Sequence, residues 1–330
     1  ANYELVYLVP QDQEKELHGI AGQQIRTFPR TGRNVPSLLR FAWRLTQVML
    51  KEKPDVVHLH STFSGVIGRC VCVLLRPWRK PKIVYCPHAF SFLMESSPTK
   101  QKAYAWIERA LQKVTNVIIC VSQYELDKAA RFGIERKRMK LIYNGIHHKD
   151  DAPKANSPEP IHLLFVGRLD YQKGFDVLLK AFAKVQRSDL KLTVVGSAVN
   201  EDSVECPPME GVEYLPWVTP GEVQVLYRKA DALIVPSRWE GFAMVPLEGM
   251  AMGLPVIASN CTSLPELVTN EVSGYVFPSG DHQALADVLT IIQKPRLLDL
   301  GSEGRSIVRE RFSAALMIRQ TYDLYRAPTF

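Results

Sequence analysis

Short apolar runs alternate with longer amphipathic runs along almost the whole chain, and this alternation restricts the fold more than any other feature. In the first half, runs that suit strands occupy residues 3–9, 55–60, 82–88, 116–122 and 140–145. Runs with helical periodicity lie between them, at residues 37–53, 65–75, 100–114 and 123–132. Strands that alternate with helices in this way form a parallel sheet covered on both faces. The first half is therefore predicted to be a doubly wound α/β domain.

The same rhythm restarts after residues 147–160, a polar segment with prolines that we interpret as a linker. Strands are predicted at residues 162–169, 190–197, 232–237 and 255–259, and helices from Gln283 and from Leu297 onward. We expect one domain over residues 1–150 and a second over residues 151–330, whose last helix can cross back to the first. Ligands of doubly wound sheets bind outside the carboxyl ends of the strands, so the predicted site is a cleft between the domains.

Length and composition argue against several other classes of protein. With 330 residues, 46% of them apolar and 23% charged, the chain is typical of a globular protein of two domains. The longest apolar run, residues 66–75, contains Arg69 and is far shorter than the roughly 20 residues of a spanning helix. The first ten residues lack the pattern of a signal peptide. The six cysteines show no metal-ligand or disulfide spacing, which favours a reducing cytoplasm.

The net charge of +7 is distributed unevenly along the chain. Residues 1–150 contain 24 Lys and Arg against 12 Asp and Glu, whereas the remainder contains 17 against 22. A basic first domain suggests an anionic partner, whether a lipid surface, a phosphorylated acceptor or nucleic acid. The segment LLRPWRKPK at residues 74–82 places Trp78 among cations, as membrane-interface patches do, although a simple basic loop has this composition too.

Two acidic residues, Glu240 and Glu248, stand eight residues apart in the run PSRWEGFAMVPLE. This run passes from the apolar strand at 232–237 through a turn at Gly241 into a helix predicted from Val245. A carboxylate before the turn and another on the first helical turn suit a hydroxyl-rich ligand, while the free amides between them face an anion. The alternative interpretation is a helix start with two solvated acids.

Two basic residues, Arg168 and Lys173, follow a strand that ends at Gly167 and precede a helix that begins near Gly174. Cations beside a helix N-terminus favour a diphosphate, because the amides, the helix dipole and the charges all attract an anion. The alternative is a surface turn with two solvated bases. Neither common phosphate loop is present, which argues against a P-loop nucleotidase and a dinucleotide oxidoreductase.

Together these residues resemble the retaining, nucleotide-sugar-dependent glycosyltransferases of family 4, which have the GT-B fold of two Rossmann-like domains with a cleft between them. The resemblance covers nearly the whole chain and rests on VSQYELDKAARFGI leading to LIYNGI, FVGRLDYQKGFDVLLKAF, PSRWEGFAMVPLEGMAMGLPVIAS and SGYVFPSGD. It implies transfer of a hexose from a nucleotide diphosphate sugar, with UDP favoured, to a glycan or polyprenyl-linked acceptor with retention of configuration. Synthesis of a surface polysaccharide or glycolipid is the expected setting.

The resemblance also implies roles for individual residues. Arg168 and Lys173 hold the donor diphosphate, Glu240 reaches the transferred sugar and Glu248 reaches the ribose. The other implied residues are Gly167, Gly241, Phe242, Ala243, Met244 and Val245 around the donor, Gly196, Trp217 and Val218 beside the base, and His60 and Ser61 on the acceptor side.

Three histidines of the first half require separate interpretation. In the family, a histidine at the position of His88 lies near the anomeric carbon and the donor phosphate, although a lone histidine at a strand end is more often structural. His58 and His60 alternate along one face of a strand, so they can share a metal only if a third ligand comes from elsewhere, and we interpret His60 and Ser61 as lining of the cleft instead.

The resemblance further implies that transfer requires no metal and no other cofactor. Arg168 and Lys173 stabilise the departing diphosphate in place of a divalent metal, in agreement with the absence of a D-x-D run near the cleft. No carboxylate is an obvious nucleophile. The expected route is front-face substitution, in which the leaving phosphate takes the acceptor's proton and His88 supports the developing charge.

The sequence departs from the family pattern in several places. The opening strand and Gly-rich turn of the family are not found before Asn2, so the first predicted strand corresponds to the family's second. Ala243 and Pro216 stand where glycine is common, and His147 stands where an acid is usual.

Other functions are compatible with parts of the sequence. A sugar-nucleotide epimerase and a glycan phosphorylase can share the architecture, but no lysine motif for pyridoxal phosphate is evident. A nucleic-acid-binding protein would use the basic first domain, yet only the Trp78 segment combines cations with an aromatic residue, so nucleic acid is not the expected partner. The expected location is the cytoplasm, with peripheral attachment to the inner face of an anionic membrane as an option.

Overall fold

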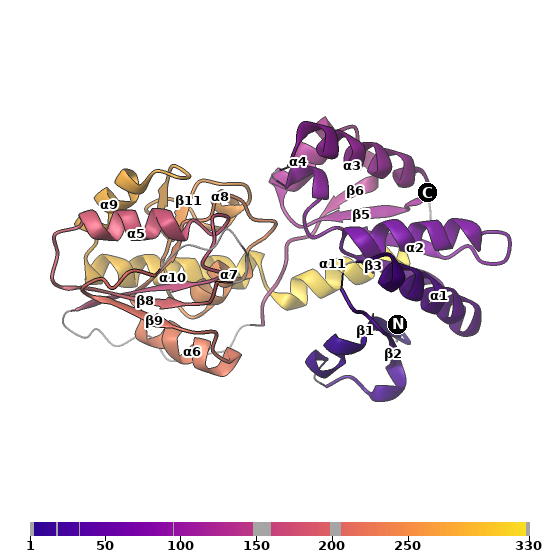
Figure 1. Ribbon diagram of the computed structural model, residues 1–330, viewed down its shortest axis with the longest axis horizontal. Coiled ribbons are helices and arrows are strands. Elements are labelled where there is room, and N and C mark those ends of the chain that lie inside the picture. The colour runs from indigo at the N-terminus through magenta and orange to yellow at the C-terminus, as the bar shows by residue number, and fades with distance from the viewer. Residues whose placement is uncertain are drawn as a thin grey trace. The chain divides into compact units, whose positions relative to one another are not determined.

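The computed structural model describes residues 3–17, 19–32, 34–94, 96–147, 160–198 and 206–327. The chain forms two compact units (Figure 1). The first comprises Ala1–Cys120, Lys128–Lys140 and Asp323–Phe330, and the second comprises Val121–Asp127 and Leu141–Tyr322. Residues 148–159, which make up most of the predicted linker, lie outside the described residues.

The main sheet of the first unit has the strand order β3-β4-β5-β6, and β4 pairs in parallel with both β3 and β5. Its strands are β3 (Val56–His60), β4 (Lys82–Cys86), β5 (Val117–Cys120) and β6 (Met139–Leu141). The helices along this part of the chain are α1 (Val35–Glu52), α2 (Thr62–Leu74), α3 (Pro98–Leu111) and α4 (Gln123–Arg131), with short 3-10 helices η3 (Ser91–Leu93), η4 (Gln112–Val114) and η5 (Arg136–Arg138). The predicted strands and helices of this region are confirmed with small shifts of their ends, except that β6 ends at Leu141 whereas the predicted strand extends to residue 145.

The opening strand pairs differently from the prediction. β1 (Tyr7–Pro10) pairs in parallel with β2 (Ile25–Phe28), and these strands form a sheet of their own rather than part of the main sheet. The short helices η1 (Gln11–Glu16) and η2 (Gly22–Gln24) connect them. Every residue of β1 is only half-buried, so this strand lacks the continuous burial of an interior parallel strand. The strand β2, which the sequence analysis did not predict, supplies its partner.

The second unit contains a six-stranded sheet in which every pairing is parallel. Its strands are β7 (Ile161–Val166), β8 (Leu190–Val195), β9 (Val212–Leu215), β10 (Ala232–Val235), β11 (Val256–Ser259) and β12 (Gly274–Phe277). Its helices are α5 (Phe175–Lys184), α6 (Pro220–Lys229), α7 (Met244–Ala251), α8 (Leu264–Leu267), α9 (His282–Ile291) and α10 (Lys294–Arg311), and α11 (Ala314–Arg326) follows.

The strand order of this sheet, β9-β8-β7-β10-β11-β12, is that of a dinucleotide-binding Rossmann domain. The chain starts at β7, builds outward to β9 and then returns to β10 on the other side of β7. The carboxyl ends of β7 and β10 therefore form the point where the direction of winding reverses. Ligands of doubly wound sheets bind at such a point. The predicted α/β fold is confirmed for this unit.

The degree of burial of each strand explains whether it could be predicted from the sequence. All four residues of β10 and of β11 are buried, which matches their uninterrupted apolar runs. β9 and β12 lie at the two edges of the sheet; the residues of β9 are half-buried or exposed, and β12 has two half-buried residues between two buried ones. Edge strands carry a weaker apolar signal, and these were not predicted as strands.

Helices cover the sheet of the second unit, and α6 and α9 are capped by nearby polar side chains. α5 lies beside α9, and α7 lies beside α10 (Figure 1). Thr219 and Glu222 form a capping box at the start of α6, and Asp281 accepts the amides of Gln283 and Ala284 at the start of α9. Within the described ranges, no helix combines the length and the apolar character required to cross a membrane.

Candidate functional site

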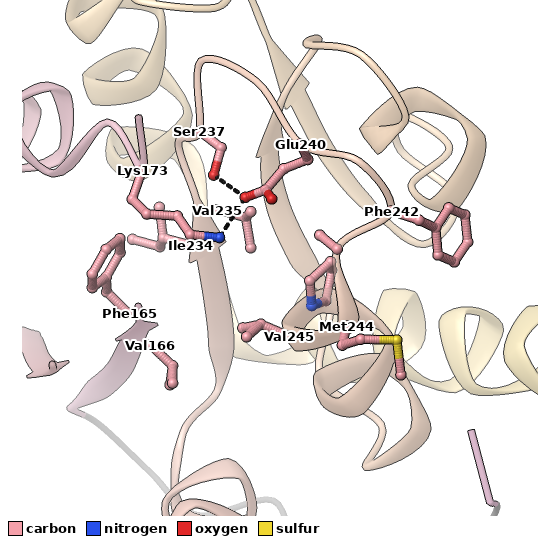
Figure 2. Close-up of a pocket in the computed structure, with 12 residues that line it drawn as sticks. Phe165, Val166, Lys173, Ile234, Val235, Ser237, Glu240, Phe242, Met244 and Val245 are labelled. Atoms are coloured by element: carbon pink, nitrogen blue, oxygen red, sulfur yellow. Dashed lines mark hydrogen bonds and ion pairs between the residues drawn. The ribbon is translucent and has the colours of Figure 1, made fainter. Parts of the chain in front are cut away.

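A pocket of about 270 Å³ lies at the winding reversal of the second unit. Its walls are formed by the ends of β7 and β10, the loop after β10 and the start of α7 (Figure 2). The pocket brings together the predicted donor-site residues Lys173, Glu240, Phe242, Ala243, Met244 and Val245. The topology of the sheet thus places residues from two distant motifs around one cavity.

An ion pair joins these two motifs within the pocket. Lys173 Nζ lies 2.7 Å from Glu240 Oε1, and Ser237 Oγ donates a hydrogen bond of 2.7 Å to the same oxygen (Figure 2). The Glu240 side chain is only 8% exposed, whereas that of Lys173 is 23% exposed. The Glu240 amide also donates to Thr262 Oγ1 at 2.9 Å. Glu240 is therefore held at both its backbone and its carboxylate.

Arg168 is paired with an acid as well. Its Nε lies 3.1 Å from Asp170 Oδ2, and its second terminal nitrogen donates to Gln172 Oε1 at 2.7 Å. Asp170 is buried and also accepts the Lys173 amide at 2.9 Å, so it organises the turn before α5. The sequence analysis treated Arg168 and Lys173 as cations that face an anion. The structure places each of them against a carboxylate.

Close backbone packing positions the turn that carries Lys173. Gly174 has φ of 66°, a conformation that side chains with a Cβ adopt at a cost. A Cβ at this position would overlap the carbonyl oxygen of Pro236, which precedes Ser237 in the neighbouring motif. The absence of a side chain at Gly174 therefore lets the two motifs approach each other.

The start of α7 contributes backbone groups to the pocket. Ala243 is its N-cap residue, and the first amides of a helix have no helical carbonyl to bond. The Phe242 side chain packs away from Lys173, with ring centroids 5.5 Å from Tyr143 and 5.8 Å from Phe312. Phe242 and Ala243 are buried, so they are suited to contribute through their backbones.

Glu248 occupies a different position from the one predicted. Because α7 begins at Met244, Glu248 is its fifth residue and lies on the second turn rather than the first. Its Oε2 accepts a hydrogen bond of 3.0 Å from Tyr227 OH of α6. Burial raises the pKa of Glu248, and the Tyr227 hydrogen bond opposes this rise. Glu248 is not among the residues that line the pocket.

The predicted base-side residues lie after the neighbouring strands. Gly196 follows β8, and its amide donates to Leu215 O at 3.0 Å. A Cβ at Gly196 would overlap the Gly167 carbonyl oxygen, so these two glycines mark a close approach of the loops after β7 and β8. Trp217 is 51% exposed and, with Val218, lies between β9 and α6. None of these residues lines the pocket.

In the first unit, the predicted histidines form a cluster of their own. His60 Nδ1 lies 2.9 Å from His88 Nε2, and Cys86 Sγ lies 3.7 Å from His88 Nδ1. The rings of His58 and His60 have centroids 4.1 Å apart, and His58 Nδ1 lies 2.7 Å from Tyr325 OH. Among the described residues, His60, Cys86 and His88 offer ligand atoms within 4.8 Å of one another.

The surroundings of this cluster favour neutral imidazole rings. Desolvation lowers the pKa of His58 to about 3, with further contributions from the charges of His60 and His88. Although part of His60 is exposed, the surrounding protein desolvates its ring and, with His88, lowers its pKa to about 4. Desolvation lowers the pKa of His88 as well. Ser61 and His88 have φ of 72° and 58°, which is strained backbone of the kind that clusters at functional sites.

Several supporting residues were not predicted from the sequence. Ser237 and Asp170 each stand three residues before a predicted site residue, a spacing typical of polar side chains in turns, so this signal was present. Thr262 and Tyr227 carry no local signal, because they reach the site from other parts of the sheet. Cys86 was seen only as one of six scattered cysteines.

A parallel sheet with a pocket at its winding reversal is typical of nucleotide-binding α/β proteins. Comparison with protein families narrows this class. The family described as Glycosyltransferase Family 4 matches residues 1–150, and the family described as Glycosyl transferases group 1 matches residues 148–299. The chain belongs to the family 4 glycosyltransferases, as the resemblance predicted.

Individual relatives agree with this assignment. A protein of Klebsiella pneumoniae, named as an uncharacterised 41.2 kDa protein in the cps region, is 35% identical over 97% of this chain and 91% of its own length. The UDP-Gal:alpha-D-GlcNAc-diphosphoundecaprenol alpha-1,3-galactosyltransferase of Escherichia coli is 24% identical over 85% of this chain and 77% of its own length.

Solved structures show the same fold at low sequence identity. Sucrose-phosphate synthase from Thermosynechococcus elongatus has a TM-score of 0.76 and 22% identity, and the match covers 93% of this chain and 84% of that one. Anabaena HepE in complex with UDP-glucose has a TM-score of 0.74 and 19% identity, with coverage of 91% and 85%. The GT-B fold class is therefore confirmed.

Proposed function

We propose that the protein transfers a hexose from a UDP-linked donor to a lipid-linked glycan, with retention of anomeric configuration, in the synthesis of a surface polysaccharide or glycolipid. The observation that carries this proposal is the pocket where Lys173 and Glu240 meet beside the first amides of α7. A cation and helix amides bind an anion, and a carboxylate binds hydroxyls. The pocket therefore suits a diphosphate joined to a sugar.

The names of similar proteins support the choice of donor and acceptor. The Escherichia coli relative is named for UDP-galactose and for an acceptor on diphosphoundecaprenol. The similar HepE structure contains UDP-glucose. The Klebsiella pneumoniae relative belongs to a cps region. A UDP-hexose and a polyprenyl-linked glycan are the substrates that these similarities favour.

Binding of the donor would exchange the partners of the two ion pairs. The diphosphate takes the place of carboxylates beside Arg168 and Lys173, which now bond Asp170 and Glu240. Once Lys173 bonds a phosphate oxygen, Glu240 can accept hydrogen bonds from sugar hydroxyls while Ser237 still holds it. This exchange of partners leaves the two cations to bind the diphosphate and leaves the Glu240 carboxylate to bind the sugar.

The residues around the donor would promote transfer by stabilising the charges that develop during the reaction. Cleavage of the bond between the sugar and the nucleotide places negative charge on the departing diphosphate, which Arg168 and Lys173 stabilise without a metal. Positioned donors of this kind contribute roughly 3 to 4 kcal/mol each by analogy with oxyanion-hole residues. In front-face substitution the leaving phosphate accepts the acceptor's proton. His88 would support the positive charge at the anomeric carbon.

The first unit carries a surface suited to a lipid-linked acceptor. Exposed apolar side chains on α1 and α2 and in the loop after α2 include Leu39, Trp43, Leu74 and Trp78, of which Trp78 is 69% exposed. The helices α1 and α2 pack together, and cations follow α2 in the segment 76–82. Aromatic residues beside cations are typical of membrane-interface surfaces. Peripheral attachment to an anionic leaflet would give the enzyme access to its acceptor.

Sedimentation with vesicles that contain anionic lipid tests this attachment. We expect the double variant Arg79→Ser/Lys80→Ser to reduce the sedimented fraction by severalfold, because each cation contributes about 1 kcal/mol near such a surface. The variant Lys191→Ser/Lys229→Ser, which changes two exposed cations of the second unit, is the matched control. Equal sedimentation of both variants and the unaltered protein would refute the attachment surface.

Titration calorimetry with UDP, GDP and ADP, followed by transfer assays with the matching hexose donors, tests the reaction. We expect UDP to bind tightest, and NMR of the product to show the anomeric configuration of the donor. Arg168→Ala should lower turnover by about two orders of magnitude. Lys180→Ala is the control, since Lys180 lies on α5, the helix that follows the Arg168 loop, and its side chain is 65% exposed. Unchanged turnover in Arg168→Ala would refute the diphosphate assignment, and an inverted product would refute retention.

A further inference from the structure

His60, Cys86 and His88 lie together at the carboxyl ends of two adjacent strands of the first unit. β3 and β4 are parallel, and His60 is the register partner of Cys86. The Ser61 amide bonds the Cys86 carbonyl oxygen at 2.9 Å, which extends this pairing by one residue. His88 follows β4 by two residues and turns its ring back toward His60. Backbone pairing therefore brings two of the three side chains together, and a turn brings the third.

The three side chains are the ligands that zinc prefers. Zn²⁺ binds imidazole nitrogen at about 2.0–2.1 Å and thiolate sulfur at about 2.3 Å, in tetrahedral geometry. Those bond lengths place two nitrogens about 3.3 Å apart and a nitrogen and a sulfur about 3.6 Å apart. His60 Nδ1 and His88 Nε2 are 2.9 Å apart, and one ligand atom from each of the three residues lies within 4.8 Å of the others. His60 Nδ1 lies beside His88 Nε2, whereas Cys86 Sγ lies beside His88 Nδ1, so coordination by all three residues requires the side chains to turn one His88 nitrogen toward the shared ion.

The state of the groups also suits a cation. An imidazole ring in its neutral form offers a lone pair at one nitrogen, so His60 and His88 can each supply one ligand atom. His60 and His88 are exposed to solvent and Cys86 is buried, so an ion can enter from the histidine side. No carboxylate belongs to the cluster, and nitrogen with sulfur ligands selects zinc over magnesium or calcium.

We propose that His60, Cys86 and His88 form a binding site for a zinc-type divalent cation, and that an ion bound there inhibits glycosyl transfer. Binding forms one Zn–S and two Zn–N bonds and releases the thiol proton of Cys86 to solvent. The fourth position stays open, as in sites with three protein ligands. The inhibitory part rests on the proposed function, because the ion occupies the ring of His88 that would support charge at the anomeric carbon.

Cobalt titration of the metal-stripped protein tests the site without reference to activity. We expect one Co²⁺ per chain with a thiolate-to-metal absorption band, and displacement by Zn²⁺. Cys86→Ser should abolish the band, and His60→Asn should weaken binding by at least tenfold. Cys70→Ser is the matched control because Cys70 is an exposed cysteine of α2 outside the cluster, and it should leave the band unchanged.

The outcomes separate the site from its effect. A band that survives in Cys86→Ser, or equal affinity in His60→Asn and the unaltered protein, would overturn the site. Because Cys86 is buried, Cys86→Ala provides a second variant if the serine variant unfolds. In transfer assays, Zn²⁺ should inhibit the unaltered protein reversibly. It should inhibit Cys86→Ser at least tenfold less, when the rate of each protein is compared with its own rate without metal. Equal inhibition of the two proteins would overturn the inhibitory role. If no nucleotide sugar serves as a donor, the proposed function is refuted, and the cobalt titration alone then decides whether the metal site exists.

Discussion

The ion pair between Lys173 and Glu240 gives the most direct test of the pocket. Lys173→Met removes the ammonium group that lies 2.7 Å from Glu240 Oε1 and keeps a side chain of similar length. Glu240 then retains the hydrogen bond from Ser237 but loses its countercharge. Glu240→Gln is the complementary change, since it removes the charge and keeps an oxygen that can accept both hydrogen bonds.

Burial determines the size of the expected effect. Removal of one partner from a fully buried ion pair costs about 3–5 kcal/mol, because the other charge is left without compensation. Lys173 is 23% exposed, so water can reach the carboxylate, and we expect a loss of about 2 kcal/mol for Lys173→Met. In a unit of this size that loss lowers the melting temperature by about 4–8 °C. Glu240→Gln should cost about 1 kcal/mol.

The double variant distinguishes the ion pair from separate effects of the two residues. If the charges interact, Lys173→Met/Glu240→Gln should lose less stability than the sum of the single variants, by about 1 kcal/mol or more. Urea denaturation followed by circular dichroism measures these free energies, and calorimetry with UDP should show at least tenfold weaker binding in Lys173→Met. Lys180→Met, at a largely exposed position of α5, is the control and should change stability by less than about 0.5 kcal/mol. Strict additivity of the single variants would refute the ion pair, and unchanged UDP affinity would refute its place in the donor site.

Three further predictions follow from buried groups. Gly174→Ala should cost more than the roughly 1–2 kcal/mol of a left-handed conformation, because its Cβ would overlap a neighbouring carbonyl, and an unchanged urea midpoint would contradict that close packing. Arg69→Met should cost about 3–5 kcal/mol by leaving buried Glu108 unpaired, whereas Arg69→Met/Glu108→Leu should recover most of this loss in the same urea assay; no recovery would contradict it. Burial raises the pKa of Glu248, so if Glu248 binds the donor ribose, as the family resemblance implies, UDP affinity measured by calorimetry should fall as pH drops through this raised pKa. The linked folding stability has the opposite sense: it is present below pH 4.5 and is lost as pH rises through the raised pKa, and Tyr227→Phe should move this window upward. If the pH profiles of UDP affinity and of folding stability do not change when Glu248 is replaced, both statements are refuted.

Much of the second unit was predictable from local sequence. The strands β10 and β11 are buried throughout and β7 and β8 are mostly apolar, because parallel strands inside a covered sheet are buried on both faces. The edge strands β9 and β12 escaped prediction because half-buried positions dilute this signal. In the first unit, β1 was predicted as a strand, but its pairing with β2 depends on a partner that follows two short helices.

In the candidate site, too, single residues were predictable from local sequence, whereas contacts between distant residues were not. Lys173 and Glu240 were both selected from their own motifs, as residues beside a helix start and a glycine turn. Their ion pair joins positions 67 residues apart, and no local pattern indicates it. Glu248 was predicted on the first turn of its helix but lies on the second, because the helix starts one residue earlier than predicted.

Local sequence was enough to predict the α/β class, the glycosyltransferase family and half of the residues that line the candidate pocket, because periodicity and motif spacing depend on neighbours along the chain. Only the tertiary structure decided that Arg168 and Lys173 are each neutralised by a carboxylate, and that Cys86 joins His60 and His88. These contacts depend on strand order and register, which place distant residues side by side at the carboxyl edge of a sheet. The ion pairs and the arrangement of the candidate metal ligands arise only when the strands pair, because pairing brings these residues together at the edge of a sheet.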